Sequence, residues 1–444
     1  MRCRVGDVVI ALSSGRTLLI VAVLCVALKG MLLFVALPAF EGASPSTYEA
    51  DEFPDGYDLI AMNLIQGNGY RFFPETCRTI LRTPGFVLAL AGIFALFGKS
   101  LIAVKVFQLL LSSLTGWLVY RLGGRIGGSQ AVGAIAALVY YFHPGTIVAD
   151  SRGGIETLFT FILVLFVFLL YRAFERHRVL DYAAAGLAFG AMLLVKSSAG
   201  LFPAFLFLYL LGSRRRLVFV RYAFVSVAAL SVAASLVLMP WIIRNYLLVD
   251  KFIPTMTVGG LVAFQGLYVV EHEGEGKQHF ELLNQASREQ ERIARELGLK
   301  HRPGFFPQFY TTEDETFYYG HLGSIVLARF RESPGLLATI AFRNAWAFWL
   351  QGRTARATLL NTVLTIPLLA MFVAGLVLAY REGRLITPVV LFIVSFVTAH
   401  LFMIAVARFY VPIIPLLAIP AAIAVAQVVG RLSSASARGS ATGA

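Results

Sequence analysis

Five carboxylates lie within eleven residues of the sequence, shortly after its first long apolar run. They are Glu49, Asp51, Glu52, Asp55 and Asp58, in the stretch 48–58. A carboxylate within hydrogen-bond reach of a hydroxyl or amine can act as the general base when that group attacks another molecule. The alternative is a solvated acidic loop, since runs of like charge are usually only hydrated. The spacing alone leaves both interpretations open.

Further ionisable residues stand where apolar runs begin or end. They are Arg82, Asp150, Glu156, Lys196, Arg244 and Arg408. Ionisable groups at a membrane boundary tend to be functional or paired, and arginine can hold a phosphate through two hydrogen bonds. The structural alternatives are helix-end ion pairs through Arg152, snorkelling of the lysine and headgroup anchoring by the last two arginines.

Composition decides the class of protein that must position these groups. Of 444 residues, 58% are hydrophobic and 14% are charged, against about 25% charged in an ordinary soluble domain. A soluble enzyme, a disordered chain and a collagen-like fibre are excluded. The net charge of +13 comes from arginines beside apolar runs, so it indicates membrane topology and not nucleic-acid binding.

Ten apolar runs are candidates to cross a bilayer, which requires roughly 17–25 residues, and the pair within 180–213 is the shortest. We expect an all-α polytopic membrane protein with about ten transmembrane helices plus interfacial helices. The expected spans are 17–40, 101–120, 130–149, 154–171, 180–196, 199–213, 217–240, 355–380, 385–406 and 409–430.

Arginine clusters mark every second loop and both ends of the chain, for example Arg214–Arg216. The positive-inside rule therefore predicts a multi-pass protein of the bacterial inner membrane with both termini cytoplasmic. The run Phe86–Phe97 is too short to span and is expected to be interfacial. The first span lacks a small-residue cleavage site, so no cleavable signal is expected.

Three regions follow from this topology. Residues 1–240 form an N-terminal transmembrane module with an acidic first outer loop at 41–100, residues 241–354 a large outer-face region, and residues 355–444 the last helices and a cytoplasmic tail. In the middle region, 280–297 reads as an amphipathic helix and 333–350 as an interfacial helix with tryptophan anchors.

Motifs for other chemistries are missing from the sequence. It contains no Walker A motif, no HExxH and no GxGxxG in a βαβ context, and its three cysteines form no CxxC pair. The histidines of the middle region have no metal-ligand spacing. These observations disfavour ATP-driven transport and zinc proteolysis.

The order of several short motifs resembles the C-type (GT-C) membrane glycosyltransferases, in the branch of bacterial protein-mannosyltransferase-like and aminoarabinose-transferase-like proteins. The matching pieces follow the acidic loop in order: Gly-Tyr-Asp-Leu-Ile-Ala-Met-Asn-Leu (56–64), Gly-Asn-Gly-Tyr (67–70), Arg-Thr-Pro-Gly-Phe (82–86), Phe-Gly-Lys-Ser (97–100), the loop 144–156 and Pro-Trp-Ile-Ile-Arg-Asn-Tyr (240–246). The resemblance covers roughly residues 15–260 and, more weakly, the last two spans.

The resemblance implies a GT-C-like fold and an essential acidic residue in the first outer loop. The family's Asp-Glu pair falls on Asp51 and Glu52, whereas a bacterial sub-branch places the acid at Asp55. We favour Asp55 and then Asp51 as the base, with Glu52 as a supporting carboxylate. The family often has Arg-Pro-Pro where this chain has Arg82-Thr83-Pro84, which weakens the role carried over to the arginine.

The resemblance also implies the reaction. The chain is expected to transfer a sugar from a polyprenyl-phosphate donor to a lipid, glycan or protein acceptor on the outer face, with arginines stabilising the phosphate that leaves. No cofactor is indicated, while a divalent metal, which some relatives use, stays open, as do the sugar and the acceptor. The alternatives are a lipid or oligosaccharide transporter or flippase, a surface-polysaccharide ligase or polymerase, and a non-catalytic membrane scaffold.

Overall fold

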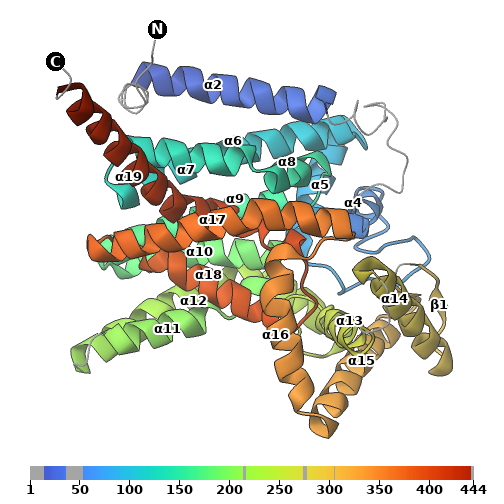
Figure 1. Ribbon diagram of the computed structural model, residues 1–444. Coiled ribbons are helices and arrows are strands. Elements are labelled where there is room, and N and C mark those ends of the chain that lie inside the picture. Colours follow the sequence, from blue (N-terminus) through green and yellow to red (C-terminus); the bar gives the residue numbers. More distant parts are fainter. Residues whose placement is uncertain (1–14, 37–53, 214–216, 274–277, 305, 442–444) are drawn as a thin grey trace.

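The computed structural model describes residues 15–36, 54–213, 217–273, 278–304 and 306–441, and these are overwhelmingly helical (Figure 1). The one sheet in these ranges is an antiparallel pair of two-residue strands, β1 (His301–Arg302) and β2 (Gln308–Phe309). The expectation of an all-α chain is confirmed.

The helices of the first half reach the end of the seventh expected span. They are α2 (Gly15–Met31), which continues into the π-helical turn η1 (Leu32–Ala36), η2 (Pro54–Gly56), α4 (Tyr57–Ile65), α5 (Pro84–Phe97), α6 (Leu101–Gly127), α7 (Gln130–Phe142), α8 (Pro144–Ser151), α9 (Glu156–Arg176), α10 (Val179–Val195), η3 (Ser197–Ala199), α11 (Phe202–Ser213) and α12 (Leu217–Val249).

The second half starts with the large middle region and ends with three long helices. Its helices are α13 (Gly259–Glu271), α14 (His279–Glu296), α15 (Thr312–Glu332), α16 (Gly335–Leu350), α17 (Ala355–Arg381), α18 (Thr387–Leu401), η4 (Ala407–Phe409), η5 (Val411–Ile413) and α19 (Ile414–Ala441). The short helices expected at 86–97, 280–297 and 333–350 are confirmed as α5, α14 and α16.

Each of the ten expected spans coincides with apolar helix in the described ranges. Five are long and apolar enough to cross a membrane alone: Leu101–Gly127, Glu156–Arg176, Arg221–Val249, Ala355–Arg381 and Ala407–Arg431. The span expected at 130–149 is the bent pair α7 and α8, and the other four are shorter apolar helices: Ile20–Ala36, Val179–Val195, Ser197–Gly212 and Thr387–Leu401. The chain is a multi-pass membrane protein.

The bend between α7 and α8 measures 52° and has a local cause. His143 separates the two helices in an extended conformation, with φ −63° and ψ 127°. The residue before a proline is disfavoured in the α region, and Pro144 itself has no N–H to continue the helix. The break turns α8 toward the start of α9, where Glu156 lies.

Glycines bring α10 and α12 into close contact. A Cβ atom on Gly186 would lie 2.3 Å from the carbonyl oxygen of Leu230, and one on Gly190 would lie 2.6 Å from that of Ala234. Glycines four residues apart form a flat stripe that lets two helices approach without side chains between them. This packing fixes the C-terminal end of α10, from which Lys196 extends.

The ends of the helices sort to two sides of the molecule. In Figure 1 the start of α2 and the end of α19 lie at one end, while α4, α14 and β1 lie at the opposite end. Parts of the two regions expected on the outer face, α4 from the first and α14 and β1 from the second, therefore lie at the same end of the molecule.

Candidate active site

Asp55 stands at the entrance to α4 in an unusual backbone conformation. Its φ is 73° and that of the following Gly56 is 71°. Non-glycine residues rarely adopt this left-handed region, and aspartate and asparagine tolerate it best. The carboxylate is one-third exposed, and its Oδ2 accepts a hydrogen bond from Nη2 of Arg408 at 3.1 Å.

Arg408 joins two carboxylates that are distant in sequence. Its Nε donates to Oε1 of Glu156, while its Nη2 donates to Asp55. Glu156 is the first residue of α9 and is only 6% exposed, whereas Arg408 is 34% exposed. The guanidinium therefore ties a nearly buried carboxylate to an accessible one.

Arg82 approaches Asp55 from the other side. Its Nε donates to the main-chain oxygen of Asp55 at 3.3 Å, and its guanidinium lies over the rings of Phe306 and Tyr57, at 4.9 Å and 5.5 Å from their centroids. Rings of this kind attract a cation while leaving its hydrogen-bond donors free. This chain has Arg-Thr-Pro where the family often has Arg-Pro-Pro, but the position of Arg82 beside Asp55 supports a role for this arginine in the site.

The segment around Arg82 is anchored to α10. The hydroxyl of Thr83 donates to the carbonyl oxygen of Val195 at 2.7 Å, and the Tyr70 hydroxyl donates to the carbonyls of Arg82 and Thr83. A Cβ on Gly85 would lie 2.8 Å from the carbonyl oxygen of Leu194. The first turn of α5 therefore touches the last turn of α10.

Lys196 follows that last turn and lies beside the same charges. Its Nζ lies 4.5 Å from the ring centroid of Phe409, the neighbour of Arg408, and 5.9 Å from that of Phe159. Glu156, Arg408 and Asp55 are all within electrostatic range of its amine. The lysine therefore lies against aromatic rings and beside charged side chains of other elements.

These five residues, Asp55, Arg82, Glu156, Lys196 and Arg408, form what we call the charged centre. It combines three cations with two carboxylates, so it carries a net positive charge when all are ionised. Burial alone would raise the pKa of Asp55, but Arg408, Arg82 and Lys196 outweigh it and hold the pKa below its ordinary value of 3.8. Asp55 is therefore ionised at neutral pH, and one positive charge remains to attract an anion.

Asp150 belongs to a different part of the molecule. Its Oδ2 lies 2.7 Å from Nζ of Lys29, and its Oδ1 accepts a hydrogen bond from the Thr157 hydroxyl at 2.5 Å. Both charged residues of the pair are buried among α2, α8 and α9. Asp150 therefore serves as the partner of a buried lysine, and neither ion pair proposed for Arg152 forms in the described residues.

Arg244 supports the segment that carries Arg82. Its Nη1 donates to the carbonyl oxygen of Thr79 at 3.0 Å, and its guanidinium lies 4.5 Å from the ring centroid of Trp241 and 5.2 Å from that of Tyr70. Arg244 thus packs against two aromatic rings, while anchoring at lipid headgroups stays a prediction. The arginine stabilises the loop, while the charged centre is built from other cations.

Glu315, on α15, supports the same loop. Its carboxylate is 2% exposed and accepts hydrogen bonds from the Thr79 hydroxyl and the Ile80 N–H, both at 2.7 Å. Burial raises its pKa despite these donors. A signal was present in the sequence, because Glu315 shares a helix face with Tyr318, Tyr319, Leu322 and Val326, all of which are buried.

Arg353 is a second residue that the sequence did not single out. It precedes α17 and lies within electrostatic range of Asp55, Arg152 and Arg408. In the described part of the chain it forms no ion pair, and its guanidinium lies 5.4 Å from the ring centroid of Phe280. A periodic pattern in the sequence cannot show that an arginine at the start of a helix lies near a residue almost three hundred positions earlier.

The remaining predicted site residues are Asp51 and Glu52, which lie outside the described residues. Their roles stay predictions from the resemblance. In the described ranges, no group of three or more His, Cys, Asp or Glu side chains is arranged to hold a metal ion. Cys25 and Cys77 are both free thiols.

The matches of this chain to known proteins are to the kind of protein that the order of its motifs resembles. Residues 82–243 match the family model described as dolichyl-phosphate-mannose-protein mannosyltransferase. A stretch of 157 residues is 30% identical to undecaprenyl phosphate-alpha-4-amino-4-deoxy-L-arabinose arabinosyl transferase 1 of Pseudomonas fluorescens (strain Pf0-1), covering 34% of this chain and 26% of the relative. The chain thus matches about a quarter of the length of this curated relative.

Two solved structures of ArnT from Cupriavidus metallidurans also align with the chain. The one bound to undecaprenyl phosphate aligns at 14% identity and a TM-score of 0.41, over 90% of this chain and 77% of that one. The apo structure aligns at 15% identity and a TM-score of 0.37, over 92% and 78%. The likeness to C-type membrane glycosyltransferases of the protein-mannosyltransferase and aminoarabinose-transferase branch, expected from the sequence, is confirmed by the family match over residues 82–243.

Proposed function

We propose that the chain is a membrane glycosyltransferase that moves a sugar from a polyprenyl-phosphate donor to an acceptor on the outer face of the bacterial inner membrane. The observation that carries the proposal is the charged centre, in which one accessible carboxylate, Asp55, lies against three cations. The family match over residues 82–243 includes three of its five members, and the name of the curated relative supports a polyprenyl-phosphate donor.

The proposed step begins with Asp55 as general base. An acceptor hydroxyl or amine attacks the anomeric carbon of the donor sugar, and Asp55 removes its proton as the new bond forms. The bond between that carbon and the phosphate oxygen breaks, and the oxygen keeps the electron pair. A single direct displacement inverts the anomeric centre.

The cations stabilise the group that leaves. Polyprenyl phosphate departs as an anion, so it needs positive charge more than a proton. Arg82, Lys196 and Arg408 supply that charge from three separate elements. Arg408 already binds two carboxylates, so an incoming phosphate competes with Asp55 for the N–H donors of Arg408. This competition weakens the ion pair between Asp55 and Arg408 and leaves the carboxylate of Asp55 free to accept a proton.

The orientation belongs to the same proposal. The arginine-rich loops would be cytoplasmic together with both chain ends, and α4, α14 and the charged centre would lie on the outer side. The position of α4 and α14 at one end of the molecule in Figure 1, opposite the start of α2 and the end of α19, supports this topology. The boundaries proposed for the three regions, 1–240, 241–354 and 355–444, stay predictions.

The test uses the full chain in lipid nanodiscs with a panel of synthetic polyprenyl-phosphate sugars. We expect release of polyprenyl phosphate from one or more of them, and a loss of at least a hundredfold in the Asp55→Asn variant, with binding of polyprenyl phosphate retained. A parent protein that releases polyprenyl phosphate from no member of the panel would overturn the proposal.

A further inference from the structure

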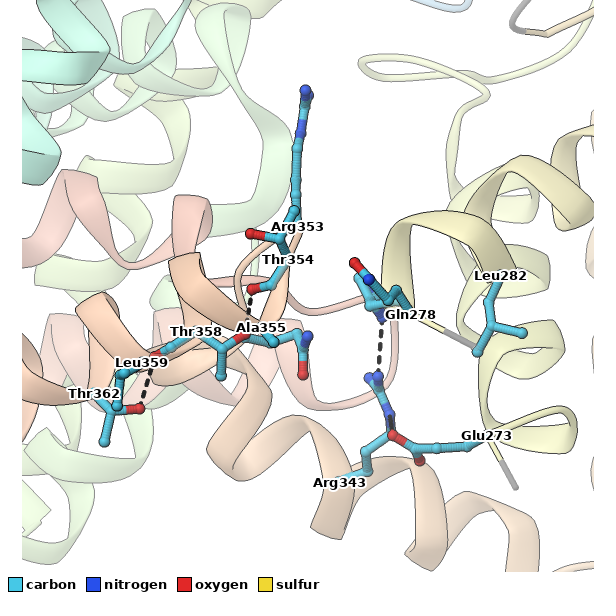
Figure 2. Close-up of a pocket in the computed structure, with 12 residues that line it drawn as sticks. Glu273, Gln278, Leu282, Arg343, Arg353, Thr354, Ala355, Thr358, Leu359 and Thr362 are labelled. Carbon is cyan, nitrogen blue, oxygen red and sulfur yellow. Dashed lines mark hydrogen bonds and ion pairs between the residues drawn. The ribbon is translucent and has the colours of Figure 1, made fainter. Parts of the chain in front are cut away.

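A cavity of about 490 Å³ lies between α14, α16 and the start of α17, apart from the charged centre. Figure 2 shows side chains of α17 on one side of it, Gln278 and Leu282 on the other, and Arg343 below. Ligand pockets of proteins commonly have volumes of about 300–1,000 Å³. The volume is therefore sufficient for a small molecule or for the head group of a larger one.

The walls of the cavity combine apolar side chains, such as those of Leu282 and Leu359, with polar groups that are mostly uncharged or paired. Arg343 is paired with Glu273 at 2.8 Å and donates to Nδ1 of His279 at 3.1 Å. Burial, together with Arg343, lowers the pKa of His279 to about 4, so this histidine is neutral at pH 7. Apart from Arg353, whose side chain extends away from Gln278 and Arg343 in Figure 2, the other polar lining groups are amides and hydroxyls, such as those of Gln278 and Thr358. Groups of this kind suit a neutral ligand rich in hydroxyls better than an anion.

One wall atom also lacks a partner. Nδ1 of His279 accepts from Arg343, so its Nε2 carries the proton, and in the described residues this buried Nε2 has no acceptor. A buried donor without a partner costs about 1–3 kcal/mol. A ligand hydroxyl that reached this atom would remove that cost.

The cavity is connected to the charged centre through a short segment. Gln351 lines the cavity, and its carbonyl oxygen accepts a hydrogen bond from the N–H of Ala407, the residue before Arg408, at 2.8 Å. Arg353 lines it as well, and in Figure 2 its side chain extends away from Gln278 and Arg343. Two members of the charged centre, Asp55 and Arg408, are within electrostatic range of that guanidinium.

We propose that this cavity binds the acceptor, and that the acceptor presents a neutral, hydroxyl-rich carbohydrate group. The inference rests on the proposed function and adds the chemical class of the second substrate. The charged centre holds the phosphate end of the donor, and the carbohydrate of the acceptor enters beside Arg353, with one hydroxyl directed at Asp55.

The first experiment maps the site with a photoreactive probe. The full chain in nanodiscs is irradiated with an octyl glucoside that carries a diazirine on its sugar, and the crosslinked peptides are identified by mass spectrometry. We expect crosslinks at 278–282 and 351–362, at least tenfold above those from an octyl phosphate probe with the same diazirine. Equal labelling by the phosphate probe, or labelling confined to other segments, would overturn the proposal.

The second experiment fills the cavity. Ala355 lines it and is exposed, so Ala355→Trp occupies the space without replacing a charged or hydrogen-bonding group. Ala338→Trp, at an exposed position of α16 that does not line the cavity, is the matched control. We expect Ala355→Trp to lower the glucoside crosslinks at least tenfold, while cleavage of the donor by water stays within threefold of the parent. The control should change neither.

The outcomes separate the two proposals. If the parent does not cleave a polyprenyl-phosphate sugar, the proposed function fails. If the parent cleaves it but Ala355→Trp leaves the crosslinks unchanged, the acceptor site is wrong and the function stands. If Ala355→Trp removes donor cleavage by water and polyprenyl-phosphate binding together, the cavity serves the donor, and the inference is likewise overturned.

Discussion

Replacement of Asp55 by asparagine removes the proposed base with little change in shape. Asparagine tolerates the left-handed backbone conformation, φ 73°, as well as aspartate does. The matched control is Asp58→Asn, three residues later on α4. Asp58 is 2% exposed and pairs with Lys99 at 2.8 Å, so it is also a bound carboxylate of the acidic loop but has its partner outside the charged centre.

The expected loss follows from the role assigned to each carboxylate. A positioned general base contributes about 10²–10⁴-fold to a rate, which is about 3–5 kcal/mol of barrier at 1.36 kcal/mol per factor of ten. The ion pair of Asp55 with Arg408 is one-third exposed on both sides, and exposed pairs contribute only about 0–1 kcal/mol to stability. Asp55→Asn should therefore lose activity by at least two orders of magnitude and remain folded.

The assay compares the rate of polyprenyl-phosphate release for parent, Asp55→Asn and Asp58→Asn, with thermal unfolding measured on the same samples. Asp58→Asn should keep its rate within about tenfold. Asp51→Asn, run alongside, tests the second candidate base. If Asp55→Asn stays within tenfold of the parent, or if Asp55→Asn and Asp58→Asn lose activity equally, the assignment of the base to Asp55 is refuted.

The remaining predictions concern pH, the support of the site and the packing. Because Asp55 has a pKa below its ordinary 3.8, it stays ionised as the pH falls, and the pH–rate profile should show no acidic loss from this group above about pH 4; an acidic limb centred near pH 6 would contradict this. Glu315→Ala leaves buried donors without an acceptor and should lower the free energy of unfolding by about 3 kcal/mol, with a lower kcat from the displaced loop; an unchanged melting temperature would contradict it. Asp150→Ala leaves the buried Lys29 without its ion-pair partner and should lower the free energy of unfolding by about 3–5 kcal/mol. The double variant Asp150→Leu with Lys29→Met should regain most of that stability. Equal stability of the single and double variants would contradict the pairing. Gly190→Leu should prevent recovery of folded protein, because its Cβ would lie 2.6 Å from the carbonyl oxygen of Ala234 in α12. The control is Gly92→Leu, at an exposed position of α5 with no atom within 4 Å of the added Cβ, which should fold normally.

Much of the architecture is determined locally and could therefore be predicted from the sequence. Long apolar stretches must form helices in a bilayer, since unpaired backbone groups are too costly there. For this reason all ten expected runs coincide with helices, and the short run at 86–97 also forms a helix, α5. The amphipathic period of 280–297 likewise predicts α14, whose helix runs from His279 to Glu296.

The members of the charged centre were also recognisable one by one. Arg82, Glu156, Lys196 and Arg408 each interrupt or border an apolar stretch, where an ionisable group is costly unless it is paired or functional. Asp150 and Arg244 satisfy the same rule and were selected for the same reason. The rule detects the cost of a charge near lipid, but it does not tell which partner offsets that cost.

The partners are decided by the tertiary structure alone. Asp150 meets Lys29 because α2 packs beside α8, and Arg408 meets Glu156 and Asp55 because η4 returns to the start of α9 after some 250 residues. Such contacts depend on how helices cross in three dimensions, which no local pattern encodes. The sequence by itself determined which segments enter the membrane and which charges need a partner, and packing determined which of those charges form a site and which hold the fold together.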